Sequence, residues 1–208
     1  MITVHHLNNS RSQRVLWLLE ELAVPYEIVR YERDPKTMLA PPALRAIHPL
    51  GKSPDITDDG QTFAESGAIL EYLVDTYGNG RLIPLAGTPE RHRYRMWMHY
   101  AEGSAMPPLL MKLVLSRVPG GEGAIAGFVD PQIGQHADYW EQALGQSEWF
   151  AGDAFTAADI QMSFPVEAAA SRGDGKARPK TAAYLKRIHA RPAYLAAVER
   201  GGPYALMR

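Results

Sequence analysis

The fold of this chain is decided by its first 31 residues, which read MITVHHLNNSRSQRVLWLLEELAVPYEIVRY. The partly β-branched run at residues 2–7 predicts a strand. Apolar residues then recur at helical spacing from Val15 to Leu22, and Pro25 ends the predicted helix. Residues 26–31 predict a second strand. Strand, helix and strand in this order form a βαβ unit, so we expect the two strands to be parallel.

The α/β pattern continues to about residue 80. In order, it predicts a short helix at 42–47, a β-hairpin of strands at 55–57 and 61–63, and a helix from Ser66 to Gly78. After Gly78 the pattern changes, because no convincing strand follows. Helices are predicted over 89–117 (bent near Pro107-Pro108), 131–144, 157–170, 180–190 and 192–199. We therefore expect an α/β domain at 1–78, a linker at 79–88 and an all-α domain at 89–208.

Composition excludes several classes of function. Lys and Arg total 22 and Asp and Glu total 23, so the net charge is −1 and no basic face for nucleic acid is indicated. The absence of cysteine excludes disulfides, thiolate metal sites and a cysteine nucleophile. Adjacent His5 and His6 would point to opposite faces of a strand and could not share a metal. No apolar run reaches eighteen residues, and no targeting segment is evident. We expect a cytoplasmic protein with no metal, membrane or nucleic-acid partner.

Three short motifs of the α/β half suggest an anionic ligand, although each also has a purely structural interpretation. Ser10 lies at the start of the first helix, where a hydroxyl beside unpaired N–H groups suits an anion, or simply caps the helix with Gln13. Gly51-Lys52-Ser53-Pro54 is either an ordinary turn or a cis-proline loop that presents the backbone of Ser53 to a ligand. Glu65-Ser66 can hold the ammonium and carboxylate of an amino acid, or cap the following helix.

Together and in this order, the three motifs resemble those of the cytosolic glutathione S-transferases. The resemblance extends over essentially the whole chain, through RVLWLLEEL at 14–22, FAGDAFTAADI at 150–160 and ARPAY at 190–194. Within that family the chain looks closest to a bacterial and fungal subgroup that has no catalytic Tyr or Cys in the first loop. The resemblance implies a thioredoxin-like N-terminal domain followed by an all-α helical domain, with glutathione as cosubstrate.

The resemblance also implies roles for individual residues. Ser10 would hydrogen-bond the glutathione sulfur, although the amide of Asn8 or Asn9 is an alternative donor. The remaining glutathione contacts would come from Lys52 (glycine carboxylate), Ser53 and cis Pro54 (cysteinyl backbone), Glu65 and Ser66 (γ-glutamyl end) and Asn9. On the second domain, Gly103 and Met106 would line the electrophile pocket, while Glu102 or Ser104 would reach the glutathione of a partner subunit. Asp55 departs from the family pattern, which has an apolar residue after the proline.

The function implied is a homodimeric transferase that conjugates the glutathione thiolate to the alkyl or aryl group of a small hydrophobic electrophile, in detoxification. One alternative is a glutathione-dependent disulfide reductase or peroxidase on the same fold. Lacking cysteine, such an enzyme would have to work through glutathione itself. The other alternative is a non-catalytic protein that binds glutathione or sequesters ligands.

Overall fold

The computed structural model describes residues 1–172 and 176–207 of the chain. It divides into two compact units. The first unit comprises Met1–Leu82 together with His189–Met207, and the second comprises Ile83–Ile188. The division between Leu82 and Ile83 falls inside the segment 79–88 that the sequence indicated as a linker.

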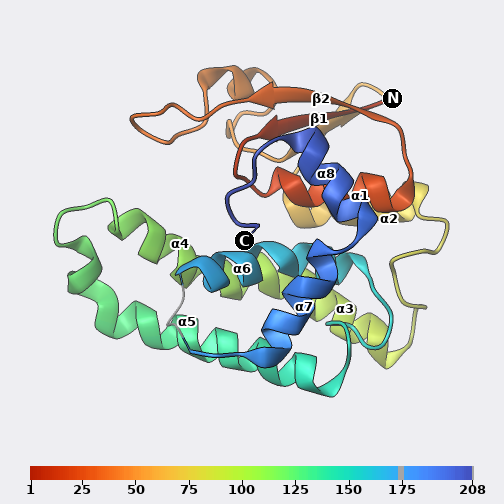
Figure 1. Ribbon diagram of the computed structural model, residues 1–208. Helices are drawn as coiled ribbons and strands as arrows, with labels where there is room; N and C mark the ends of the chain where they lie inside the picture. Colours follow the sequence, from red (N-terminus) through yellow and green to blue (C-terminus); the bar gives the residue numbers. More distant parts are fainter. Residues whose placement is uncertain (173–175, 208) are drawn as a thin grey trace. The chain divides into compact units, whose positions relative to one another are not determined.

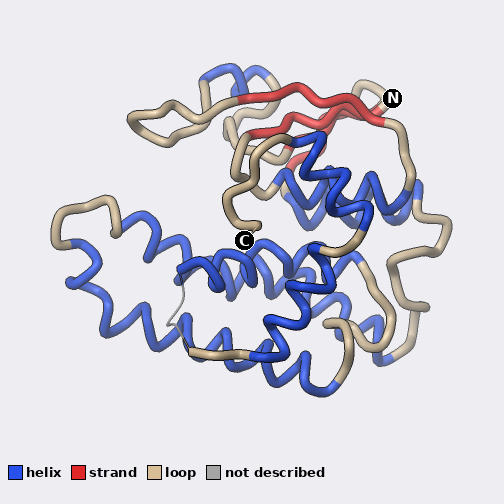
Figure 2. Tube along the Cα trace, in the orientation of Figure 1, coloured by secondary structure: helices blue, strands red, loops and turns tan. Residues whose placement is uncertain are grey.

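The first unit is built on a four-stranded sheet with the strand order β2-β1-β3-β4. The strands are β1 (Ile2–Leu7), β2 (Tyr26–Tyr31), β3 (Asp55–Asp58) and β4 (Gln61–Ala64). Val4 of β1 pairs with Ile28 of parallel β2 on one side and with Ile56 of antiparallel β3 on the other. The predicted parallel βαβ unit and the predicted hairpin are therefore both confirmed, and Figure 2 shows the strands of this sheet in red, side by side.

Helices cover both faces of this sheet. They are α1 (Ser12–Leu22), the 3-10 helix η1 (Pro42–Ala46), α2 (Ser66–Tyr77) and α8 (Pro192–Gly201). Helices α1, α2 and α8 lie on one side of the sheet and η1 lies on the other (Figure 1). The residues of α1 that recur at helical spacing, Val15, Leu18, Leu19 and Leu22, are all buried against this core. This arrangement confirms the expected α/β class of the N-terminal half.

Helix α8 packs on α1 and so belongs to the first unit, whereas the sequence had assigned residues 89–208 as a whole to the helical domain. Two ion pairs join the helices. The guanidinium of Arg191 donates to the Glu21 carboxylate at 2.9 Å, and that of Arg200 donates to Glu20 at 2.8 Å. Periodicity reveals that a segment is a helix with one apolar face, but not which neighbour that face will meet.

The second unit is helical. Its helices are α3 (Pro89–Tyr100), the π-helical turn η2 (Ala101–Ala105), α4 (Met106–Leu115), α5 (Gly121–Gln146), α6 (Ala157–Arg172) and α7 (Pro179–His189). Buried aromatic rings form the core, and the ring of Phe150 lies 4.7 Å from that of Trp97 and 5.0 Å from that of Tyr184. Asp159 accepts hydrogen bonds from the backbone and hydroxyl of Thr156, as expected of a capping box before α6.

Two helices of the second unit differ from the sequence prediction. Helix α5 begins at Gly121, ten residues before the predicted start. The glycines of this segment suggested a loop, but Gly120, with a left-handed backbone at φ 72°, directly precedes the helix. The predicted bend near Pro107-Pro108 takes the form of the π-helical turn, in which the N–H of Met106 reaches the carbonyl of Ala101. The two prolines have no N–H to donate back into the helix, which accounts for the local change of hydrogen bonding.

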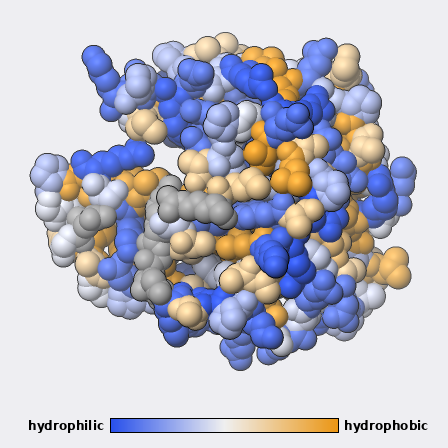
Figure 3. Space-filling view, viewed as in Figure 1, coloured by the Kyte–Doolittle hydropathy of each residue, from blue (hydrophilic) through white to orange (hydrophobic). Residues whose placement is uncertain are grey.

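Among the described residues, no helix combines the length and the apolar character needed to cross a membrane. On the face seen in Figure 3, hydrophilic residues surround smaller hydrophobic patches.

The close approach of α8 to α1 at Gly201 provides a test of this packing. A Cβ atom at Gly201 would lie 2.8 Å from Leu16 Cδ1 and 3.0 Å from Gln13 Oε1. Gly201→Ala should therefore lower the free energy of unfolding by about 1–2 kcal/mol in urea denaturation. Gly127→Ala on α5 is the control, because nothing lies within 4 Å of its Cβ position. This control should raise stability by about 0.5–1 kcal/mol, and a similar gain at Gly201 would contradict the packing.

Candidate glutathione site

The loop between β1 and α1 carries Ser10, which is 4% exposed. The Ser10 hydroxyl accepts a hydrogen bond from the backbone N–H of Ser12 at 3.2 Å and contacts the hydroxyl of Ser12 at 2.7 Å. The Ser10 hydroxyl thus pairs with one of the backbone N–H groups that have no partner inside α1. The backbone N–H of Gln13 donates to the carbonyl of Ser10. The side chain still lies at the helix N-terminus, where a negative charge is favoured.

Ser12 links this loop to His6 of β1. Its hydroxyl lies 2.8 Å from His6 Nδ1 and 3.3 Å from the carbonyl oxygen of Leu7. His5, the neighbour of His6, instead contacts Tyr31 and Thr57. The two histidines therefore point to opposite faces of the sheet, as predicted.

The segment Gly51–Pro54 lies beside the end of β1, and the peptide bond between Ser53 and Pro54 is cis, as the resemblance implied. The Ser53 hydroxyl donates to the carbonyl of His5 at 2.9 Å and accepts from the N–H of Leu7 at 3.3 Å. Its side chain therefore fastens the loop to β1. Lys52, the preceding residue, is exposed.

Glu65 and Ser66 lie at the start of α2. Glu65 has a left-handed backbone, with φ 69°, and an exposed side chain that makes no capping hydrogen bond. Ser66 is buried, and its hydroxyl accepts a hydrogen bond from Nη1 of Arg14 at 3.2 Å. Sequence reasoning missed Arg14. The available signal was its position four residues before Leu18, on the face of α1 that is buried.

The side-chain oxygens of Asn8 and Asn9 are both engaged within the first unit. Asn8 Oδ1 accepts from the N–H of Arg33 at 3.1 Å, and Asn9 Oδ1 accepts from the N–H of Ala205 at 2.8 Å. The C-terminal segment after α8 therefore lies against the first loop. Each amide keeps its NH₂ group as a possible donor.

The predicted electrophile and cross-subunit residues lie in the second unit. Glu102, Gly103 and Ser104 belong to the π-helical turn η2, and Met106 begins α4. Gly103 and Ser104 are exposed, whereas Met106 is 4% exposed. The predicted glutathione residues thus all lie in the first unit, and these four residues all lie in the second.

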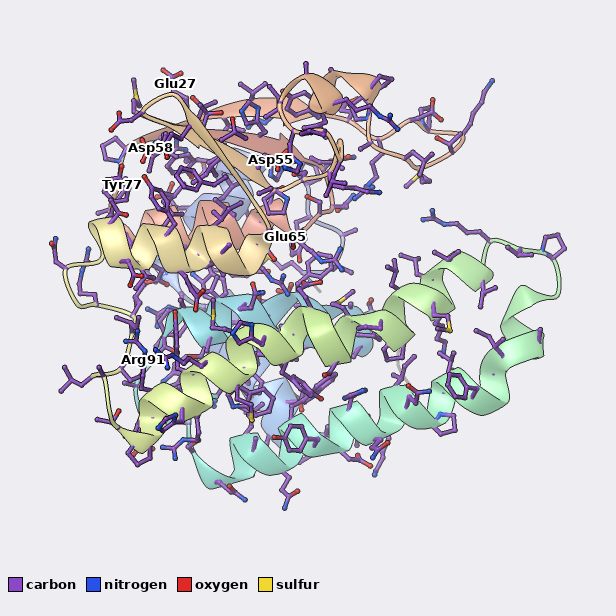
Figure 4. All side chains as sticks on the ribbon, turned by 180° about the vertical axis from the view of Figure 1, so that it is seen from behind. Glu27, Asp55, Asp58, Glu65, Tyr77 and Arg91 are labelled. Carbon is purple, nitrogen blue, oxygen red and sulfur yellow. The ribbon has the colours of Figure 1, made fainter. Side chains whose placement is uncertain are left out.

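Strand β3 carries two buried carboxylates in different surroundings. Tyr72 donates to Asp58 at 2.9 Å, and Tyr77 also donates to it. Asp55 is 1% exposed, yet its Oδ2 has no hydrogen-bond partner among the described residues. The pKa of Asp55 is raised to about 6, mainly by burial of its carboxylate. The electrostatic interaction with His48 lowers this pKa, and that with Glu65 raises it. Figure 4 shows Asp55 and Glu65 at one end of β3 and α2, with Asp58 and Tyr77 at the other.

No group of three or more His, Cys, Asp or Glu side chains within residues 1–172 and 176–207 has an arrangement that could hold a metal ion.

Comparisons with known proteins connect this geometry to one family. The model of the glutathione S-transferase N-terminal domain matches residues 10–76, and the model of the glutathione S-transferase C-terminal domain matches residues 121–197. These two matches together include most of the chain.

Individual relatives agree with the family models. Glutathione S-transferase 3 of Schizosaccharomyces pombe is 41% identical over 81% of this chain and 74% of its own length. Glutathione S-transferase 1 of Saccharomyces cerevisiae is 32% identical over 96% and 95%. The crystal structure of a glutathione S-transferase from Actinobacillus pleuropneumoniae has a TM-score of 0.90 at 35% identity, covering 100% of this chain and 96% of that one.

The buried carboxylate of Asp55 should make stability depend on pH. Its raised pKa means that the folded chain holds this proton more tightly than the unfolded chain, so stability falls as pH rises from about 4 to about 6. Relative to Asp55→Asn, the wild type should lose up to about 2–3 kcal/mol of unfolding free energy between pH 4 and pH 7.5. Urea denaturation at several pH values measures this difference. Asp59→Asn in the exposed turn is the control, and an equal pH dependence in the two variants would contradict the prediction.

Proposed function

The chain belongs to the glutathione S-transferase family, and we propose that it activates the thiol of glutathione at Ser10 and transfers the thiolate to small hydrophobic electrophiles. The observation that carries this proposal is the position of the Ser10 hydroxyl at the N-terminus of α1, next to the strand end that holds the cis Ser53–Pro54 loop. Residues 8–12 contain neither Tyr nor Cys. Within the family we therefore assign the chain to the bacterial and fungal subgroup that lacks these catalytic residues.

Glutathione would bind along the first unit. The γ-glutamyl carboxylate is received by the Ser66 hydroxyl and the N-terminus of α2, and its ammonium by the Glu65 carboxylate. The backbone of Ser53 pairs with the cysteinyl residue, a role compatible with the engagement of its side chain on β1. Exposed Lys52 faces the glycine carboxylate, and Asn9 completes the contacts beside the sulfur.

The free energy of the interactions available at Ser10 is large enough to ionise the thiol of glutathione. A thiol with a pKa of about 8.5 is only about 3% ionised at pH 7. Lowering that pKa to about 6.5 requires about 2.7 kcal/mol. A hydrogen bond to a charged group contributes about 1.5–3 kcal/mol, and a helix N-terminus adds about 0.3–1 kcal/mol. Ser10 acts as a donor to the sulfur, so no general base is required.

The second unit would supply the electrophile site. Gly103 and Met106 line that pocket, and Glu102 or Ser104 reaches the glutathione of the other subunit in a homodimer. The π-helical turn that carries residues 102–104 supports this assignment, because such turns are frequent at functional sites. The protein would act in the cytoplasm, in detoxification.

An activity panel tests the reaction class. Purified protein with glutathione is assayed against an aryl halide, an epoxide, a peroxide and a small disulfide. Turnover of the aryl halide or the epoxide is expected. Turnover of the peroxide or disulfide alone would replace transfer by reduction, and glutathione binding without any turnover would indicate a non-catalytic binding protein.

Replacing Ser10 tests its role as the sulfur's donor. Ser10→Ala should raise the pKa of the thiol of bound glutathione by about 1–2 units, because one pKa unit corresponds to about 1.4 kcal/mol of hydrogen bonding to the thiolate. Ultraviolet titration of the thiolate in the complex measures this shift directly. Loss of the contact with the Ser12 N–H should also lower stability by about 1 kcal/mol.

A matched cap separates the two effects of that substitution. The Thr88 hydroxyl accepts from the N–H of Arg91 at the start of α3, in the second unit. Thr88→Ala should lower stability by a similar amount and leave the thiol titration unchanged. If Ser10→Ala behaves in the same way, Ser10 is only a cap, and Asn8→Ala and Asn9→Ala become the variants to titrate.

Glu65 should contribute to glutathione affinity. Glu65→Ala removes the carboxylate proposed to bind the γ-glutamyl ammonium, and should weaken binding by about 1.5–3 kcal/mol in isothermal calorimetry. Asp75→Ala is the control because Asp75 is an exposed carboxylate on the same helix, nine residues after Ser66. Equal affinities of these two variants for glutathione would show that its γ-glutamyl end does not bind at Glu65.

A further inference from the structure

Arg14 is a charged residue that lies almost completely inside the first unit, with 1% of its surface exposed. It belongs to the first turn of α1, where its backbone N–H donates to the carbonyl of Arg11 at 3.1 Å. Nη1 of its guanidinium donates to the hydroxyl of Ser66 at 3.2 Å, between residues 52 positions apart in the chain. Since Ser66 is the first residue of α2, this contact joins the beginnings of two helices.

The chemistry of the two groups fixes the direction of this hydrogen bond. A guanidinium stays charged in a protein and has only donors, whereas a hydroxyl has one hydrogen and two acceptor positions. Ser66 therefore accepts from Arg14 and keeps its own hydrogen for another partner. Within residues 1–172 and 176–207, no acceptor takes that hydrogen.

The surroundings of the Ser66 hydroxyl favour an anion as that partner. Glu65, the residue before α2, makes no side-chain capping bond, so it leaves the first N–H groups of the helix uncapped. The positive end of the helix dipole lies at the same place. Donation from the charged guanidinium of Arg14 also polarises the hydroxyl, which makes its hydrogen a stronger donor. A carboxylate is the kind of group that these features together would hold.

We propose that Arg14 is a positioning residue for the γ-glutamyl end of glutathione. By donating to the Ser66 oxygen, it keeps the hydroxyl hydrogen of Ser66 directed to the α-carboxylate of the ligand. This inference rests on the proposed function, which assigns that carboxylate to Ser66. Arg14 acts through Ser66 without touching the ligand, and the pair makes the first unit selective for thiols that carry a carboxylate at this end.

Replacing Arg14 tests the proposal. Arg14→Met keeps a long unbranched side chain but removes every donor, so glutathione should bind about tenfold more weakly in isothermal calorimetry. Arg14→Lys keeps a charged group that only donates and should recover part of this loss. Arg81→Met is the control in the same unit, because Arg81 donates at 2.9 Å to the carbonyl of Leu22, away from Ser66. It should bind glutathione as the wild type does.

A ligand analogue separates positioning from a merely structural role. In γ-aminobutyryl-cysteinyl-glycine the thiol and the ammonium of glutathione are kept and the α-carboxylate is missing. The wild type should bind this analogue more weakly than glutathione, and Arg14→Met should bind it as the wild type does. If Arg14→Met weakens the binding of both ligands by the same factor, Arg14 only supports the fold and the proposal is overturned. Should Arg14→Met fail to fold, Arg14→Lys takes its place in this comparison, with a smaller expected loss for glutathione.

A double-mutant cycle tests whether Arg14 acts through Ser66. Ser66→Ala should weaken glutathione binding by itself, and adding Arg14→Met to it should cause little further loss. Losses that multiply in the double variant overturn the proposal.

The same measurements distinguish failure of the inference from failure of the proposed function. If Ser66→Ala weakens glutathione binding and Arg14→Met does not, the inference fails while the proposed site stands. If Ser66→Ala binds glutathione as tightly as the wild type, the γ-glutamyl carboxylate does not bind at Ser66, and both the proposed site and the inference fail.

Discussion

Strand β1 is hydrogen-bonded on both sides, and the arrangement of the first unit depends on that double pairing. Parallel pairing with β2 requires a crossover, which α1 provides, so the loop before α1 emerges at the carboxyl end of β1. The N–H of Asn8 then extends the ladder to the carbonyl of Tyr31, and the Ser53 hydroxyl bridges His5 and Leu7 on the opposite edge. The first loop and the cis-proline loop are thereby fixed to the same end of one strand.

Alternation along β1 separates two polar groups that are neighbours in sequence. His5 lies on the face that carries Tyr31 and Thr57, and His6 lies on the face covered by α1 and α8. A shift of register by one residue would exchange these two environments. Pairing of β1 with both neighbours therefore determines not only the sheet but also which imidazole can reach Ser12.

Much of the fold could be predicted because its signals are local. The alternation of a strand, the apolar spacing of a helix and a helix-ending proline such as Pro25 each involve residues only a few positions apart. The same signals could not place α8, since the Arg191–Glu21 contact between α8 and α1 joins residues 170 positions apart in the chain. The early start of α5 was also hidden, because glycine is permitted in a helix as well as in a loop. In the site, Ser10 and Ser66 were recognised as hydroxyls at helix starts, and Ser53 as a residue that presents its backbone beside a cis proline. Their hydrogen-bond partners depend on tertiary contacts, and Arg14 shows this most clearly.

Two serines of the proposed site illustrate how such partners change the chemistry of one residue type. Ser66 accepts a hydrogen bond from the guanidinium of Arg14, so its own hydrogen is available to an incoming carboxylate. Ser10 instead lies 2.7 Å from the hydroxyl of Ser12, which in turn lies 2.8 Å from His6 Nδ1. The first arrangement favours anchoring of glutathione at its γ-glutamyl end. The second holds the Ser10 hydroxyl at the N-terminus of α1, beside the position proposed for the sulfur, so affinity and thiol acidity can be set by different residues of the same unit.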